Sequence, residues 1–155
     1  LSVRLGAVPG PFRYRARADG LVAPPLDVRA TVRPDEATGE PWIETTAVPL
    51  LEGTGVVFAL PEGVTPIETN LRGAVHDRRW RATVMPVPPA GITLRVRLPE
   101  GGFARMGDGR VLAVVHGAPG GVDWQRLPPW LPQDTIVWTA RSYFILPWPA
   151  WAGAR

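Results

Sequence analysis

Two histidines and two serines are the residues from which this sequence could build a metal site or a catalytic nucleophile. His76 and Asp77 make a poor pair of zinc ligands, because adjacent residues on a strand point to opposite faces. His116 ends a different expected strand, and neither Ser2 nor Ser142 sits in a Gly-x-Ser-x-Gly turn. The chain has no Cys, which excludes thiolate sites. The sequence therefore predicts no catalytic residue, no metal ligand and no cofactor in this segment.

Acidic residues and glycine-rich turns give no stronger catalytic signal. No spacing implies a shared cleft for glycoside hydrolysis among Glu40, Glu44, Asp123 and Asp134. Gly107-Asp108-Gly109 lacks both the carboxylate series of an EF-hand and the Gly-Lys-Ser/Thr of a phosphate-binding loop. We interpret it as a tight hairpin turn before a strand.

Seven Trp residues are the compositional feature that favours a binding function, since an indole ring can stack on a sugar or fill a peptide pocket. The three in expected strands, Trp42, Trp80 and Trp138, are interpreted as core. The other four form a candidate ligand or interface surface in a Pro-rich loop and the C-terminal tail: Trp124, Trp130, Trp148 and Trp151. Packing of these four in the core or within the loop is the alternative, and the sequence leaves both open.

All 17 basic residues are Arg, against 14 acidic residues, for a net charge of +3. Because Arg titrates far above Lys, the high isoelectric point overstates the positive field at neutral pH. Arg clusters surround Trp80 and alternate with apolar residues at 12–18, where a half-buried strand would place them in water. We expect no nucleic-acid partner.

Alternating apolar and polar residues predict strands, and Pro and Gly, of which the chain has 19 and 17, separate one expected strand from the next. The expected strands cover residues 12–18, 26–33, 42–51, 55–60, 66–71, 79–85, 92–98, 110–116 and 135–146. This spacing predicts an all-β fold, a single antiparallel β-sandwich of the immunoglobulin-like kind. The strand at 42–51 is expected to pair with 55–60. A Pro- and Trp-rich ordered loop is expected at 117–134.

The length of 155 residues suits one domain. We expect the sandwich to occupy residues 1–147 and a C-terminal tail to follow at 148–155. No apolar run approaches the length of a membrane span. Because the chain begins without Met or a signal sequence, we expect it to be part of a longer protein.

Several stretches resemble the region that follows the membrane spans in bacterial membrane-bound zinc metallopeptidases of the endoplasmic-reticulum-metallopeptidase type, which are aminopeptidase-like proteins. Residues 60–66 (Leu-Pro-Glu-Gly-Val-Thr-Pro) are similar to a Leu-Pro turn of that family. Residues 89–96 (Pro-Ala-Gly-Ile-Thr-Leu-Arg-Val) are similar to its Pro-x-Gly strand. Residues 127–143 are similar to its closing Leu-Pro loop and last strand.

The resemblance covers residues 2–147 and implies a non-catalytic accessory domain. In that family the zinc ligands and the catalytic carboxylate belong to an upstream peptidase domain, and none of those motifs occurs here. The implied partners are the upstream peptidase and membrane domains of the same chain, with zinc in the parent protein and this domain on the extracytoplasmic side. A carbohydrate- or peptide-binding module that uses the Trp-rich loop is the alternative.

Overall fold

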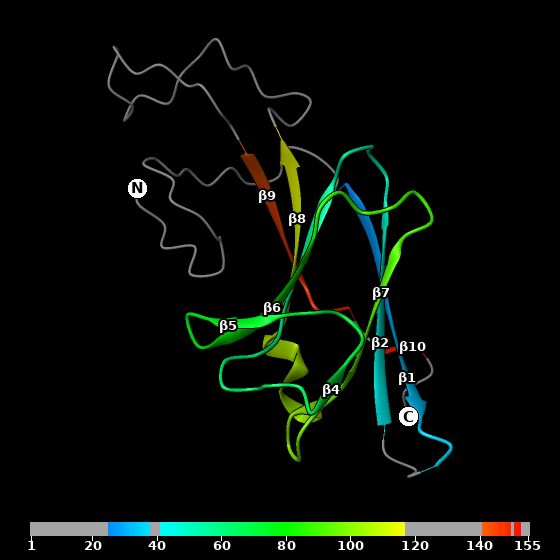
Figure 1. Ribbon diagram of the computed structural model, residues 1–155, viewed down its shortest axis with the longest axis vertical. Coiled ribbons are helices and arrows are strands. Elements are labelled where there is room, and N and C mark those ends of the chain that lie inside the picture. Colours follow the sequence, from blue (N-terminus) through cyan, green and yellow to red (C-terminus); the bar gives the residue numbers. More distant parts are fainter. Residues whose placement is uncertain (1–24, 38–40, 117–140, 150, 153–155) are drawn as a thin grey trace.

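Two β-sheets packed face to face make up the described part of the computed structural model (Figure 1). The structure describes residues 25–37, 41–116, 141–149 and 151–152. The expected all-β sandwich is confirmed. The strand expected at 12–18, the loop at 117–134 and Trp138 lie outside the described residues.

The first sheet, here sheet A, contains five strands in the order β10-β1-β2-β7-β4. Neighbouring strands in sheet A are antiparallel, except that β10 makes a short parallel pairing with β1. The strands are β10 (Trp151–Ala152), β1 (Leu26–Pro34), β2 (Pro41–Pro49), β7 (Ile92–Arg97) and β4 (Glu68–Thr69).

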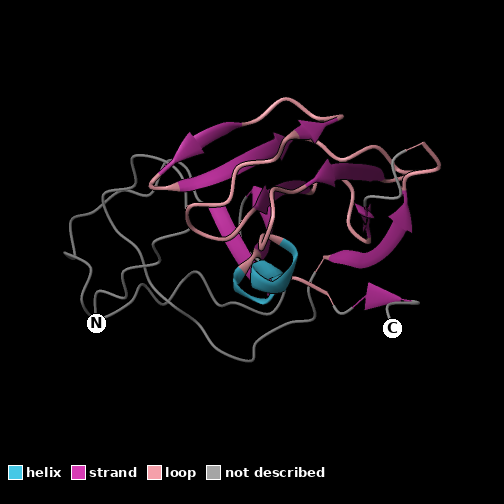
Figure 2. Ribbon diagram, turned by 90° about the horizontal axis from the view of Figure 1, so that it is seen from below, coloured by secondary structure: helices cyan, strands magenta, loops and turns pink. Residues whose placement is uncertain are grey.

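The second sheet, here sheet B, is antiparallel throughout its described strands and has the order β5-β6-β3-β8-β9. The strands are β5 (Ala74–His76), β6 (Arg79–Val84), β3 (Gly55–Ala59), β8 (Arg110–His116) and β9 (Arg141–Pro147). A 3₁₀ helix, η1 (Phe103–Asp108), lies at one end of the sandwich (Figure 2).

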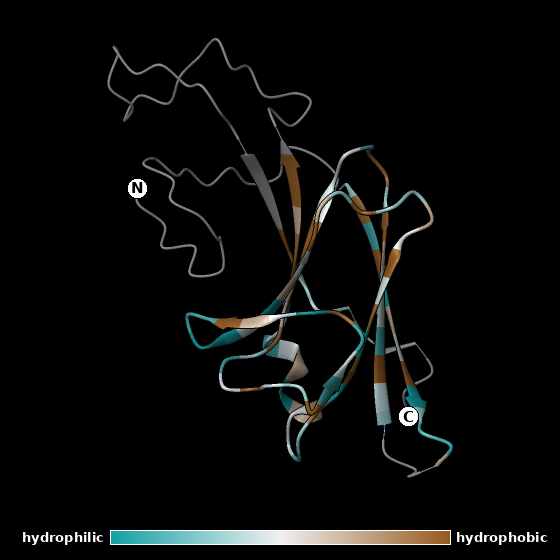
Figure 3. Ribbon diagram, viewed as in Figure 1, coloured by the Kyte–Doolittle hydropathy of each residue, from teal (hydrophilic) through white to brown (hydrophobic). Residues whose placement is uncertain are grey.

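Alternation along the strands separates core from surface as the sequence predicts. In β2, Ile43, Thr45 and Ala47 are buried, while the residues between them are only partly covered. The core fills the space between the sheets around Phe58, and brown apolar segments mark both layers in Figure 3. A second, smaller buried cluster lies on the opposite face of β3 and β8: Val57, Ala59, Leu112 and Val114.

The two identical Leu-Pro-Glu-Gly segments, at residues 60–63 and 98–101, form the same kind of turn. Gly63 and Gly101 both have φ of 78°, a conformation that suits Gly because it has no Cβ. The backbone N–H of Val64 donates to the carbonyl of Pro61 (3.1 Å), and that of Gly102 donates to Pro99 (2.9 Å). The expected positive-φ glycine turns are confirmed.

The expected pairing of β2 with β3 is wrong, because these strands belong to different sheets. Every residue of β3 is buried, which requires a central place with both faces covered. β3 obtains that place between β6 and β8, so residues 50–54 cross from sheet A to sheet B instead of closing a hairpin.

The hairpin turn expected at Gly107-Asp108-Gly109 is also wrong. β7 and β8 lie in different sheets, so the chain crosses the end of the sandwich between them as η1. Met106 is the buried residue of this helix, and its carbonyl accepts a hydrogen bond from the N–H of Gly109 (2.9 Å).

The sandwich extends past the expected boundary at residue 147. Trp148 belongs to the core, and β10 pairs with Ala30 and Thr31 of β1. Trp148, Trp151 and Ala152 therefore take part in the fold, where a C-terminal tail was expected. Neither β10 nor β5 was expected, since both are too short to show a period.

Candidate binding face on sheet A

Trp148 is not available as a ligand surface. Its side chain is 6% exposed and packs against Phe58, with ring centroids 6.3 Å apart. Its backbone N–H donates to the carbonyl of Gly109 (3.3 Å), which fixes the chain after β9 against the end of η1. Of the two alternatives that the sequence left open for Trp148, core packing is the one observed.

The structure does not test the other three candidate Trp residues as a surface. Trp124 and Trp130 lie outside the described residues. The backbone of Trp151 forms part of β10, which pairs with β1, and the structure does not describe the Trp151 side chain. The sequence-based binding surface therefore remains a prediction for these three positions.

Trp42, interpreted from sequence as core, lies on the outer face of sheet A. Its neighbour Ile43 is buried in the core, so alternation turns Trp42 away from it. The indole Nε1 donates to Oδ2 of Asp35 (2.9 Å). The guanidinium carbons of Arg95 and Arg97 each lie 5.7 Å from the ring centroid, within the range of a cation–π contact.

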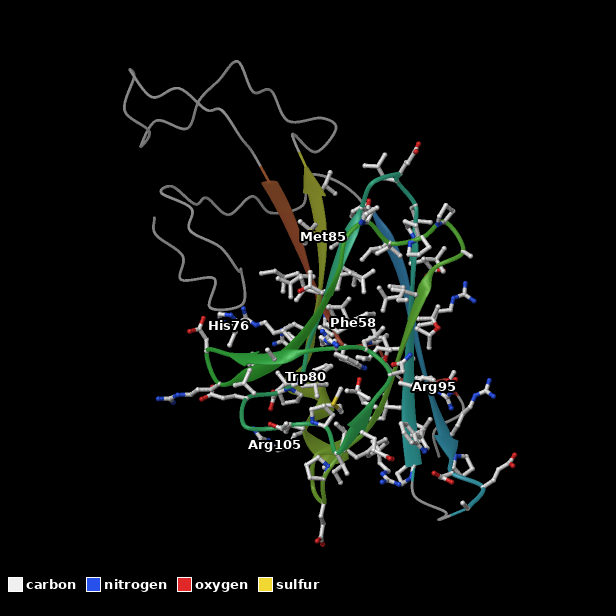
Figure 4. All side chains as sticks on the ribbon, viewed as in Figure 1. Phe58, His76, Trp80, Met85, Arg95 and Arg105 are labelled. Carbon is white, nitrogen blue, oxygen red and sulfur yellow. The ribbon has the colours of Figure 1, made fainter. Side chains whose placement is uncertain are left out.

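Glu44 lies two residues after Trp42 on the same face and joins two arginines from the strands on either side of β2. Its Oε2 is 3.1 Å from Nε of Arg33 on β1, and its Oε1 is 3.2 Å from Nε of Arg95 on β7. The Glu44 side chain is 18% exposed, whereas those of Arg33 and Arg95 are 70% and 54% exposed. The carboxylate is thus held close to the sheet, and the guanidinium groups reach into solvent. In Figure 4, Arg95 points away from the layer that holds Phe58.

Further polar contacts continue along the same outer face. Arg97 pairs with Glu68 (2.8 Å), and Arg29 pairs with Asp27 (3.2 Å). The hydroxyl groups of Thr46 and Thr93 are 2.8 Å apart. We call the set formed by Arg33, Trp42, Glu44, Thr46, Thr93 and Arg95 the sheet A face. The sequence signal for it was the alternation itself, since the inward set of Ile43, Thr45 and Ala47 leaves Trp42 and Glu44 outside.

The basic and aromatic cluster at 78–81 does not form a stacking surface, because Trp80 is a core residue. Arg81 is also largely buried. Burial lowers the pKa of the Arg81 guanidinium below its ordinary value; attraction to Asp77 opposes this shift, and repulsion from Arg79 adds to it. Arg79 donates through Nη1 to the backbone carbonyls of Leu60 (3.3 Å) and Asp108 (2.9 Å). Arg79 therefore links β6 to the residue that follows β3 and to η1.

The described residues with catalytic or metal-binding potential do not gather at one place. His76 is exposed at the end of β5, and His116 ends β8. Within residues 25–37, 41–116, 141–149 and 151–152, no three His, Asp or Glu side chains gather in a group that could hold a metal ion. No helix in that part of the chain is long and apolar enough to cross a membrane.

No protein-family model, curated protein or solved structure matches the chain.

Proposed function

We propose that this chain is a non-catalytic accessory domain of a membrane-bound, zinc-dependent metallopeptidase, lying on the extracytoplasmic side and contacting the peptidase and membrane domains of the same protein. Two of the three stretches behind the resemblance have a definite place in the described part of the sandwich. Residues 60–66 contain the turn at Gly63, and Val64 lies in the core. Residues 89–96 run into β7, an inner strand of sheet A.

The observation that supports this proposal is that described residues behind the resemblance lie at buried or turn positions. Leu94 and Val96 are fully buried on the inner face of β7, and Gly91 has φ of 92° with a Cβ position that would meet the carbonyl of Ala47 at 2.9 Å. A resemblance at buried and turn positions favours a shared domain type, because these positions determine how the strands pack.

The test begins with the coding sequence upstream of Leu1. We expect hydrophobic spans and a His, Asp and Glu zinc site there. The full-length product should hydrolyse aminopeptidase substrates, lose that activity to a chelator and regain it with Zn²⁺. The isolated residues 1–155 should be inactive in the same assay. An upstream region with neither spans nor zinc ligands would contradict the proposal.

A ligand-binding module is the second candidate, and the sheet A face favours it. Trp42 and the Arg33–Glu44–Arg95 array give sheet A an ordered polar face that the core does not require. Glycan and peptide arrays probed with the chain would test it. We expect Trp42→Ala to reduce retention while the thermal melt is kept, and Trp124→Ala and Trp130→Ala to test the original loop hypothesis. Equal retention by all variants would contradict this candidate.

A further inference from the structure

We infer that Arg33 and Arg95 form a binding site for the carboxylate groups of an acidic polysaccharide on the outer face of sheet A. The inference rests on the second candidate function, ligand binding, and is independent of the metallopeptidase proposal. Its starting point is the arrangement of two guanidinium groups around one carboxylate that is held near the sheet.

Glu44 orients the two guanidinium groups and leaves their outer donors available. Each arginine approaches Glu44 through Nε, at 3.1 Å for Arg33 and 3.2 Å for Arg95. Within the described part of the chain, neither makes a hydrogen bond through its Nη groups. The planar guanidinium fork is suited to paired hydrogen bonds with a carboxylate, and here two forks are already fixed at one place.

The exposure of the two guanidinium groups favours an anionic ligand at this point. Arg33, Glu44 and Arg95 together carry one net positive charge; beside them Arg29–Asp27 and Arg97–Glu68 are neutral pairs, and Asp35 at the Trp42 indole carries one negative charge. Glu44 is the least exposed of the three side chains, so the guanidinium groups of Arg33 and Arg95 lie further out in solvent than its carboxylate. Exposed ion pairs of this kind contribute little to folding stability, so stability alone gives no reason for the arrangement.

The position of the array in the sheet argues against a peptide that binds by adding a strand. Glu44 and Arg95 lie on β2 and β7, which are inner strands with β1 and β4 beyond them. The backbone N–H of Arg95 already donates to Oδ1 of Asn70 (2.7 Å). A peptide that binds by adding a strand needs a free sheet edge, and the middle of this face does not offer one.

Neighbouring polar groups extend the face along the strands. The Trp42 ring lies against the guanidinium groups of Arg95 and Arg97 and supports them, and the hydroxyl groups of Thr46 and Thr93, 2.8 Å apart, lie within one or two strand positions of Glu44. Arg29 follows on β1 four residues before Arg33, about 13 Å away along the strand. A polymer with repeated acid groups can reach both arginines, whereas a single sugar acid cannot.

Binding of the full chain to polygalacturonate, measured by calorimetry at low salt, tests the inference. Dextran serves as the neutral polysaccharide and polyglutamate as the acidic polypeptide. We expect binding to polygalacturonate to exceed binding to either of these at least tenfold. Arg33→Gln and Arg95→Gln should each weaken it about tenfold, which corresponds to about 1.4 kcal/mol. Arg33→Lys should also weaken it, because the charge is kept but the fork is lost.

Arg72→Gln is the matched control, since Arg72 is exposed in the connection between β4 and β5 and its substitution removes the same charge. An equal effect of Arg72→Gln and Arg33→Gln would overturn the inference, as would full binding by the Arg33→Gln, Arg95→Gln double variant with an unchanged melting temperature. Tighter binding to polyglutamate would assign the face to an acidic peptide and overturn it too. Binding to dextran that depends on Trp42 and not on the arginines would leave the second candidate function standing and refute this inference alone.

Discussion

Replacing Trp148 with Ala is expected to destabilise the sandwich strongly, because this side chain is a core residue and no part of a ligand surface. A Trp side chain buries about 200 Å². At about 25 cal/mol per Å² this burial is worth about 5 kcal/mol. Among the described residues the buried Nε1–H has no hydrogen-bond partner, and removing such a donor returns about 1–3 kcal/mol. The net expected loss in the free energy of unfolding is about 3 kcal/mol.

Urea denaturation followed by fluorescence gives a direct measurement of that loss. With a slope of about 2 kcal/mol per molar urea, the Trp148→Ala midpoint should fall by about 1.5 M. Trp148→Phe keeps an aromatic ring against Phe58 and removes the unpaired donor, so its midpoint should stay within about 0.5 M of the parent protein. Leu50→Ala is the exposed control, at 67% exposure, and should shift the midpoint by less than about 0.25 M.

Two results would refute this reasoning. A Trp148→Ala protein that unfolds at the midpoint of the parent protein would show that the side chain does not support the core. A Trp148→Phe protein as unstable as Trp148→Ala would show that the indole N–H has a partner whose loss is costly. The first result would also restore Trp148 as a candidate for ligand binding.

Two further substitutions test the packing of each sheet. Thr45→Val should raise the free energy of unfolding by about 1 kcal/mol, because the buried Thr45 hydroxyl has no hydrogen-bond partner in the described part of the chain and Val has the same shape. A calorimetric melting temperature at or below that of the parent protein would contradict this. Gly73→Ala should lower the free energy of unfolding by about 1–3 kcal/mol, because a Cβ there would collide with the Trp80 ring and the carbonyl of Arg81. Urea titration measures this loss, and Gly107→Ala is the control because a Cβ at Gly107 meets open space.

Local sequence patterns predicted most of the strands, because alternation and proline are properties of short segments. The Pro-bracketed alternation around Arg29 and Arg33 gives β1, and the repeated Leu-Pro-Glu-Gly gives two turns with φ of 78°. The sheet to which each strand belongs depends on packing between distant residues. β3 could therefore be located as a strand, yet its partners β6 and β8 could not be deduced from its neighbour β2.

The candidate face was missed because residue type was given more weight than position. An aromatic residue in a strand is most often core, and this rule holds for Trp80. For Trp42 the alternation of β2 was the better guide, since Ile43 already occupies the inward direction. The approach of Arg33 and Arg95 to one carboxylate depends on the register of three strands, with Glu44 opposite Thr31 and Arg95, and no short pattern contains that register.

The two sheets differ in what their outer faces offer a partner, and this difference constrains both candidate functions. On sheet B the outward side chains of the central strands, Val57 and Leu112, are already buried. On sheet A the central outward positions hold Glu44 and Arg95, with guanidinium groups in solvent. A partner that meets the sandwich through sheet A, whether a sugar chain or another domain of the same protein, would therefore meet charge first. Such an association should weaken as salt is raised, because exposed charges are screened over about 10 Å at 0.1 M ionic strength. Contact through an apolar surface would not weaken in this way, so a salt titration of either complex would show which face is used.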